Sequence, residues 1–227
     1  MKLISTIAKV GILIFFVQSA FAAATGEPIR HVKTDEKVVA LTFDDGPDKP
    51  YTEQILGVLD KHNVKATFFV LGGNAKAYPD LIKKIMKDGH DLGNHTMSHS
   101  MMKNKSVETM KNDIASVDKI LRNLGYEKEI TFRAPFGITS PNLKTALQQL
   151  DKRMVLFTFL PQDWTKISSQ QIYNNVMKQM KPGLIITLHD GGARRENTVK
   201  ATEMLIDNLQ KQGYRFVTVS ELLKLQK

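Results

Sequence analysis

Two adjacent carboxylates at the end of an apolar segment are the first residues in this sequence that could do chemistry. Residues 41–43 are apolar or β-branched, and they lead directly into Asp44 and Asp45, which Gly46 and Pro47 follow. One carboxylate of such a pair can bind a cation while its neighbour accepts a proton. The same residues also suit an Asx turn that caps a helix. A phosphatase with an aspartyl nucleophile would need a second Asp where Gly46 stands, so that class is disfavoured.

A pair of histidines lies further along the chain. His95 and His99 are four residues apart, and on a helical turn they would share one face. Imidazole nitrogens and carboxylate oxygens are ligands that zinc prefers. A histidine pair also arises by chance on protein surfaces, so a metal site depends on further residues. We expect ordinary surface roles for His31 and His62, and a strand-entry role for His90.

Three later segments add groups of other kinds. Arg133 could orient a carboxylate through a bidentate contact, and the tight loop 134–137 could present a backbone amide to a substrate oxygen. Trp164 is the only tryptophan, follows Asp163, and is suited to stacking on a sugar ring. His189 ends an apolar segment ahead of a glycine-rich loop. Each segment also has a purely structural explanation: a surface turn, a core tryptophan or a buried histidine.

Most of these segments follow an apolar, β-branched stretch typical of a buried strand. The predicted strands are Val38–Phe43, Ala66–Leu71, His90–Gly93, Ile130–Arg133, Met154–Leu160, Leu184–Leu188 and Phe216–Val219. The predicted helices are Thr52–His62, Asp80–Lys87, Val107–Leu124, Asn142–Leu150, Ser169–Met180 and Thr198–Gln212, with a short last helix from Ser220. This alternation predicts an α/β fold with a parallel sheet, whose functional side chains gather beyond the carboxyl ends of the strands. The pattern alone leaves an open sheet and a barrel as alternatives.

The amino-terminal segment has the pattern of a cleaved secretory signal. Lys2 and Lys9 give a basic start, residues 10–17 are an unbroken apolar run, and small residues precede the expected cut. The apolar run is much shorter than the about 20 residues that span a bilayer, which disfavours a membrane anchor. We therefore expect removal of residues 1–22, which leaves residues 23–227 as a single domain with its own core.

The composition narrows the class of protein and its partners. The chain has no Cys, so disulfides, thiolate zinc sites and cysteine nucleophiles are excluded. The net charge is +9, or +7 without the two lysines of the signal, which suits an anionic cell-envelope polymer. The basic residues are scattered, and we expect no nucleic-acid partner. We also expect a monomer without stable membrane insertion, exported to the periplasm or secreted.

Taken together and in this order, the segments resemble those of the polysaccharide deacetylases, the NodB-homology enzymes of carbohydrate esterase family 4. The most specific parts are residues 42–47 and 95–99, and the resemblance extends from Val38 to Leu222. It implies a single-domain, distorted (β/α) barrel with about seven parallel strands. It also implies a metal-dependent hydrolase that removes acetyl groups from N-acetylated amino-sugar polymers or oligomers, such as peptidoglycan or chitin, and releases acetate.

The resemblance further implies a role for each charged residue. Asp45, His95 and His99 would hold one divalent cation, zinc or another such as cobalt. Asp44 would act as the general base, and Arg133 would keep it ionised and oriented. A second group would serve the leaving amine and the substrate. In that group His189 is the general acid, Asp163 keeps it cationic, and the substrate-binding residues are Pro135, Phe136, Gly137, Trp164 and Leu188.

Within the resemblance, the backbone amide of Phe136 would help to hold the oxyanion, while Trp164 and Leu188 would shape the acetyl pocket. Three positions depart from the family pattern. Leu160 stands where Asp is frequent, Phe136 replaces a frequent Tyr, and Ser100 replaces a common Pro after the second histidine. These changes remove a secondary contact, a phenol group and a rigid residue, and they leave every proposed ligand, acid and base in place.

Two other functions remain compatible with these motifs. An O-acetyl esterase acting on xylan or another acetylated polymer would use the same site. A glycan-binding relative with weak or no turnover would be expected to lack Asp44 or His189, and both are present.

Overall fold

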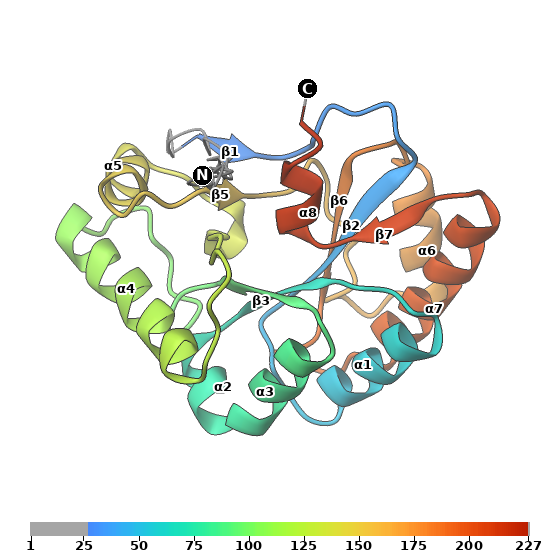
Figure 1. Cartoon of the computed structure of the whole chain (residues 1–227), viewed down its shortest axis with the longest axis horizontal. Coiled ribbons are helices and arrows are strands. Elements are labelled where there is room, and N and C mark those ends of the chain that lie inside the picture. Colours follow the sequence, from blue (N-terminus) through green and yellow to red (C-terminus); the bar gives the residue numbers. More distant parts are fainter. Residues whose placement is uncertain (1–26, 227) are drawn as a thin grey trace, which may run out of the picture.

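The computed structural model describes residues 27–226, which form strands surrounded by helices (Figure 1). The strands are β1 (Pro28–Ile29), β2 (Val38–Asp44), β3 (Thr67–Val70), β4 (Asp91–Asn94), β5 (Met154–Val155), β6 (Leu184–His189) and β7 (Arg215–Val217). The helices are α1 (Tyr51–Lys61), α2 (Gly72–Ala77), α3 (Pro79–Lys87), α4 (Val107–Asn123), α5 (Pro141–Gln149), α6 (Ser169–Met177), α7 (Glu196–Lys211) and α8 (Val219–Leu223), with a 3₁₀ turn η1 (Pro135–Gly137). The predicted α/β fold is confirmed, and the described residues form seven strands, of which six coincide with predicted ones.

Strand β2 is the centre of the sheet. All seven of its residues are buried, and it pairs in parallel with β6 along most of its length and with β3 and β7 over shorter stretches. Its register places Asp44 opposite His189 on β6. Because the strands are parallel, their carboxyl ends lie at the same edge. Asp44 and His189, both predicted to be catalytic, therefore meet at this edge.

Single-residue bridges close the sheet into a distorted barrel. Strand β3 pairs with β4, and Phe132 bridges both Asn94 on β4 and Met154 on β5. Strand β5 pairs with β1, after which His31 forms an antiparallel bridge to Leu184 on β6. The predicted strand 130–133 is thus reduced to one bridging residue. The predicted strand 154–160 shortens to two residues because the chain turns away to form the wall of the site.

Apolar helical faces cover the outside of the barrel. On α4, Met110, Ile114, Val117 and Leu121 are all buried, and the Ser106 hydroxyl caps the helix by accepting from the Thr109 amide. This stripe of every third or fourth residue is the expected amphipathic pattern. The other predicted helices also form, with ends that differ by a few residues.

Three further elements differ from the expectation. Strand β1 is too short, and the six-residue α2 too rich in glycine, to be predicted from an apolar pattern. The last predicted strand ends at Val217, and Val219 instead opens α8. The reason is a capping box in which Thr218 and Glu221 satisfy each other's backbone amides.

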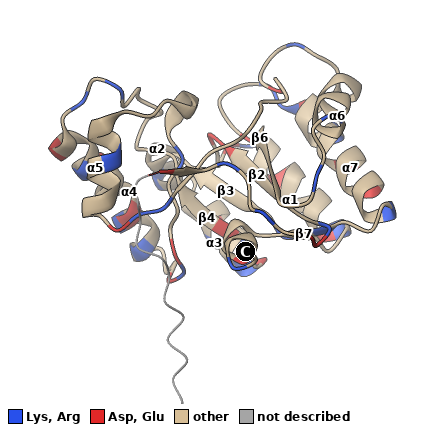
Figure 2. Cartoon of the chain, turned by 90° about the horizontal axis from the view of Figure 1, so that it is seen from above, with Lys and Arg blue, Asp and Glu red and all other residues tan. Residues whose placement is uncertain are grey.

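Charge is spread over the molecule. Figure 2 shows Lys and Arg residues on both halves of the fold, among Asp and Glu residues, rather than on one helix. Within residues 27–226 no helix is both long and apolar enough to cross a bilayer. The predicted signal peptide, residues 1–22, lies outside the described residues.

Replacement of Gly183 by Ala should destabilise the barrel at its closure. Gly183 has φ +76°, and an added Cβ would lie 1.8 Å from the carbonyl oxygen of Val32. We expect Gly183→Ala to lower the free energy of unfolding by more than about 2 kcal/mol in urea denaturation. The control is Gly57→Ala on α1, where nothing lies within 4 Å of the new Cβ and a gain of about 0.5–1 kcal/mol is expected. Equal effects of the two substitutions would contradict the account.

Candidate active site

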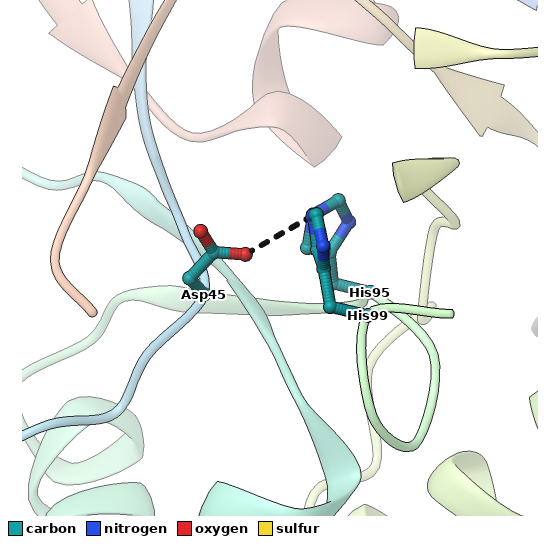
Figure 3. A group of neighbouring side chains, drawn as sticks. All are labelled: Asp45, His95 and His99. Atoms are coloured by element: carbon teal, nitrogen blue, oxygen red, sulfur yellow. Dashed lines mark ion pairs between the residues drawn. The ribbon is translucent and has the colours of Figure 1, made fainter. Parts of the chain in front are cut away.

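Asp45, His95 and His99 converge beyond the ends of β2 and β4 (Figure 3). The Asp45 Oδ1 atom lies 3.5 Å from His95 Nε2 and 3.4 Å from His99 Nε2. Ligand atoms bound at about 2.0–2.1 Å around a tetrahedral zinc ion lie about 3.3 Å apart. Asp45 Oδ1 is also buried without a hydrogen-bond partner among the described residues. The three side chains therefore fit a divalent cation with one carboxylate and two imidazole ligands.

Unusual backbone conformations aim these ligands at one another. Asp45, Thr96 and His99 all have positive φ, at 74°, 72° and 56°. Such conformations are costly for residues other than glycine and concentrate at functional sites. The segment from His95 to His99 is accordingly an irregular turn, where the sequence had indicated a helical face. The four-residue spacing brings both imidazoles to one cation through this turn.

Burial favours the neutral form of the two imidazoles, which is the form that binds a cation. It lowers the pKa of His95 and of His99, although Asp44 opposes the effect on both. The imidazoles are therefore neutral and have a nitrogen lone pair to donate near neutral pH. Burial also raises the pKa of Asp45. A carboxylate that is costly to ionise alone gains the most from a nearby cation.

Asp44 belongs to a separate buried ion pair. Arg133 is fully buried, and its Nη1 donates to Asp44 Oδ1 and to Thr42 Oγ1, both at 2.7 Å. Its Nε donates to the Val155 carbonyl, and its guanidinium lies 3.9 Å above the Phe69 ring centroid. The expected bidentate contact is wrong, because Nη2 has no partner among the described residues. Arg133 nevertheless holds the Asp44 carboxylate in an ion pair at 2.7 Å.

His189 and Asp163 form the third unit of the site. Asp163 Oδ1 lies 2.8 Å from His189 Nδ1, and Oδ2 accepts from the His189 amide and from the Thr198 hydroxyl. Burial lowers the pKa of His189, but attraction to Asp163, with smaller contributions from Asp44 and Asp45, raises it to about 8. His189 is therefore a protonated side chain at neutral pH, facing the strand end that carries Asp44.

A cavity of about 330 Å³ joins these three units. It is lined by Asp44, Asp45, His95, His99, Ala134, Phe136, Phe157, Leu160, Trp164 and His189. Trp164 packs edge-on against His189, and Phe136 packs edge-on against His99. Both rings are largely exposed, at 42% and 57%, so each has surface free for a ligand. Apolar walls around a few polar groups are typical of a small-molecule site.

Several residues lie elsewhere than the sequence suggested. Leu188 is fully buried in the outer core and does not line the cavity. Pro135 and Gly137 do not line the cavity. They belong to the η1 turn, which is closed by two hydrogen bonds that the amides of Gly137 and Ile138 donate. The amide of Phe136, with φ 59°, takes no part in those two bonds. Sequence reasoning missed Phe157 as a wall residue, since it belongs to no motif.

Comparison with known proteins identifies the family. The sequence pattern described as polysaccharide deacetylase matches residues 31–155. A peptidoglycan-N-acetylglucosamine deacetylase of Bacillus cereus is 40% identical over 202 residues, which cover 88% of this chain and 94% of that protein. The chain belongs to the polysaccharide deacetylase family. A chitooligosaccharide deacetylase of Sinorhizobium fredii is 34% identical, with 78% of this chain and 87% of that protein covered.

Solved structures of this family share the fold. A peptidoglycan N-acetylglucosamine deacetylase bound to a hydroxamic-acid-type benzamide superimposes with a TM-score of 0.82 at 34% identity, covering 87% of this chain and 94% of that one. An acetyl xylan esterase of Clostridium thermocellum in complex with a cobalt ion superimposes with a TM-score of 0.78, also at 34% identity, covering 83% and 91%. The resemblance inferred from the sequence is thereby confirmed.

In this member of the deacetylase family, α4 holds the histidine turn in place. Asn94 is fully buried, and its amide donates to the Ile114 carbonyl and to Asp118 while its oxygen accepts from the Thr96 amide. Asp118 also pairs with the buried Lys152 at 2.7 Å. The strained turn is thus tied to a long, well-packed helix. Such contacts around metal ligands fix their orientation.

Loss of the Asn94 side chain should weaken both the fold and the site. Asn94→Leu leaves buried partners on α4 and at Thr96 unsatisfied, and it should cost about 2–3 kcal/mol of unfolding free energy. Zinc affinity should fall about 10- to 100-fold, measured by competition with a chromophoric chelator. Asn104→Leu at an exposed position serves as the control. Unchanged zinc affinity in Asn94→Leu would contradict the role assigned to this contact.

Proposed function

We propose that this chain is a metal-dependent hydrolase, with zinc as the cation, that removes acetyl groups from N-acetylated amino-sugar polymers or oligomers and releases acetate. One observation carries the proposal. A spare carboxylate, Asp44, is paired with Arg133 beside a triad that fits a divalent cation, and it lies opposite His189 in the strand register. The named activities of the relatives, on peptidoglycan and on chitooligosaccharides, agree with that substrate class.

The chain's own residues supply the proton transfers of the reaction. A divalent cation held by Asp45, His95 and His99 would polarise the acetyl carbonyl and lower the pKa of a water molecule. Asp44 accepts the proton of the attacking water, and Arg133 holds the Asp44 carboxylate in position for that transfer. The Phe136 amide donates to the oxygen that becomes negative. His189 then protonates the leaving amine, so that the carbon–nitrogen bond breaks to give acetate and a free amino sugar.

The properties of His189 favour an amide over an ester substrate. An amide nitrogen must receive a proton before it can leave, whereas an alkoxide is a better leaving group without one. A pKa of about 8 leaves His189 protonated at neutral pH, and Asp163 holds it in place for that transfer. The similarity to an acetyl xylan esterase makes O-deacetylation the second candidate, and acetylated xylan belongs in the same assay.

We also propose that the protein acts outside the cytoplasm, in the periplasm or after secretion, as residues 1–22 indicate. Its glycan substrate would then be within reach. Amino-terminal sequencing of the protein from cell fractions should give Ala23 as the first residue. Recovery of the exported protein with residues 1–22 intact would contradict cleavage.

Replacement of the proposed base should abolish turnover and leave the metal site intact. Asp44→Asn should lower acetate release from chitin oligomers by about 10²- to 10⁴-fold while the variant still binds one zinc ion, because Asp44 is not part of the triad. The purified chain should also lose activity on chelation and regain it with zinc. The experiment compares chitin oligomers, peptidoglycan and acetylated xylan by acetate release. Full activity in Asp44→Asn would remove Asp44 as the base.

Activity should fall as the pH rises through the pKa of His189. The protonated form is the active one, so kcat should decline above about pH 8. Asp163→Asn removes the main group that raises this pKa, and the decline should move to lower pH. The raised pKa of His189 also affects the stability of the fold. Because the pKa in the folded protein exceeds the ordinary value of about 6.5, protonation of His189 stabilises the folded state at low pH. That contribution is lost as the pH rises above about 8. An unchanged profile in Asp163→Asn would contradict this assignment.

A further inference from the structure

A second cavity meets the first one at the metal-ligand triad. Its volume is about 530 Å³, and it is lined by Asp45, Asp48, Leu71, Asn74, Tyr78, His99 and Gly192. Asp45 and His99 line both cavities. The other wall residues differ: aromatic and aliphatic side chains dominate the first cavity, and polar groups dominate the second. The triad therefore lies at the junction of an apolar cavity and a polar one.

Polar groups of the second cavity are free to bind a ligand. The Asp48 carboxylate, the Asn74 side-chain oxygen and the Tyr78 hydroxyl have no hydrogen-bond or ion-pair partner within residues 27–226. Together they offer acceptors and one hydroxyl that can donate or accept. A sugar ring carries hydroxyl and amide groups that complement this set. The mechanism described above uses none of these three groups.

Helix α2 fixes this wall relative to the metal ligands. The amides of Gly72 and Gly73 donate to the carbonyls of Thr96 and Met97, at 3.0 and 2.9 Å. The Asn74 side-chain amide donates to the Asp45 carbonyl at 2.8 Å. The helix that carries Asn74 and leads to Tyr78 is thus bonded to both ligand-bearing turns. A ligand held there has a defined position with respect to the reacting carbon.

We propose that the second cavity binds the sugar that adjoins the one being deacetylated, through Asp48, Asn74 and Tyr78. This proposal rests on the proposed function. The volume lies within the range of about 300–1,000 Å³ that small-molecule sites occupy, so a pyranose ring fits. The Asp48 carboxylate, which is not one of the metal ligands, selects a neutral or cationic neighbour, such as an acetylated or free amino sugar. A neighbour with a free carboxylate is disfavoured by like charge.

The test separates binding of the neighbouring sugar from the chemical step. Wild type, Tyr78→Phe and Asp48→Asn are assayed as zinc-loaded proteins on a chitin pentamer and on an aryl acetate, which has no neighbouring sugar. The ratio of kcat/KM for the pentamer to that for the aryl acetate should fall about fivefold in each variant. The loss should appear mainly in KM. Tyr214→Phe, at a half-buried position, and Asp80→Asn, at an exposed one, line neither cavity and should keep the wild-type ratio.

The outcomes distinguish this proposal from the proposed function. A wild-type ratio in both Tyr78→Phe and Asp48→Asn, with the pentamer still deacetylated, overturns the second sugar site and leaves the deacetylase function standing. Hydrolysis of the aryl acetate without release of acetate from any glycan overturns both. A fall in the ratio for both variants, with unchanged ratios in the two controls, supports the site.

Discussion

The arrangement of the site depends on two neighbouring carboxylates that have different partners. Asp44 and Asp45 are adjacent in sequence and both lie in the interior, where unpaired negative charges are costly. Arg133 pairs with Asp44 alone, at 2.7 Å. Asp45, turned away by its positive φ, faces two imidazole nitrogens. One buried arginine therefore gives the two carboxylates different partners, as the proposed roles of base and metal ligand require.

This division is maintained by neighbouring elements whose side chains take no part in the proposed reaction. Strand alternation puts Thr42 and Asp44 on the same side of β2 as Arg133, inside the barrel. The Asp45 turn and the histidine turn are both strained, and α2 and α4 hold them by hydrogen bonds to backbone groups, which on α4 include the bond that Asp113 accepts from the Met97 amide. The helices thus stabilise conformations that the local sequence would not adopt alone. The same bonds give the second cavity its fixed wall.

Much of this arrangement could be predicted because it follows from periodicity. Parallel strands end at one edge, so Asp44 and His189, on paired strands, had to lie close together. The position of Leu188 follows from the alternation of side chains along β6, although the sequence analysis had placed it in the acetyl pocket. Leu184, Ile186 and Leu188 alternate onto the outer core beneath the helices, so Leu188 points away from the cavity.

Other features have no pattern in the sequence. The barrel closes through single bridges at Phe132 and His31, which are too short to produce an alternating signal. Phe157 and Tyr78 acquire their roles from the path of irregular segments, and no motif marks them. The strained turn at His95–His99 brings the ligands together in a way that a helical spacing rule does not describe. Tertiary contacts, rather than local preference, decide these positions.

The most direct test of the central claim is anomalous diffraction at the zinc absorption edge from crystals of the zinc-loaded protein. The account predicts a single strong peak bounded by Asp45 Oδ1, His95 Nε2 and His99 Nε2, with Asp44 still paired to Arg133. A peak that is coordinated by Asp44 in place of Asp45, or one that lies away from the two histidines, would contradict it.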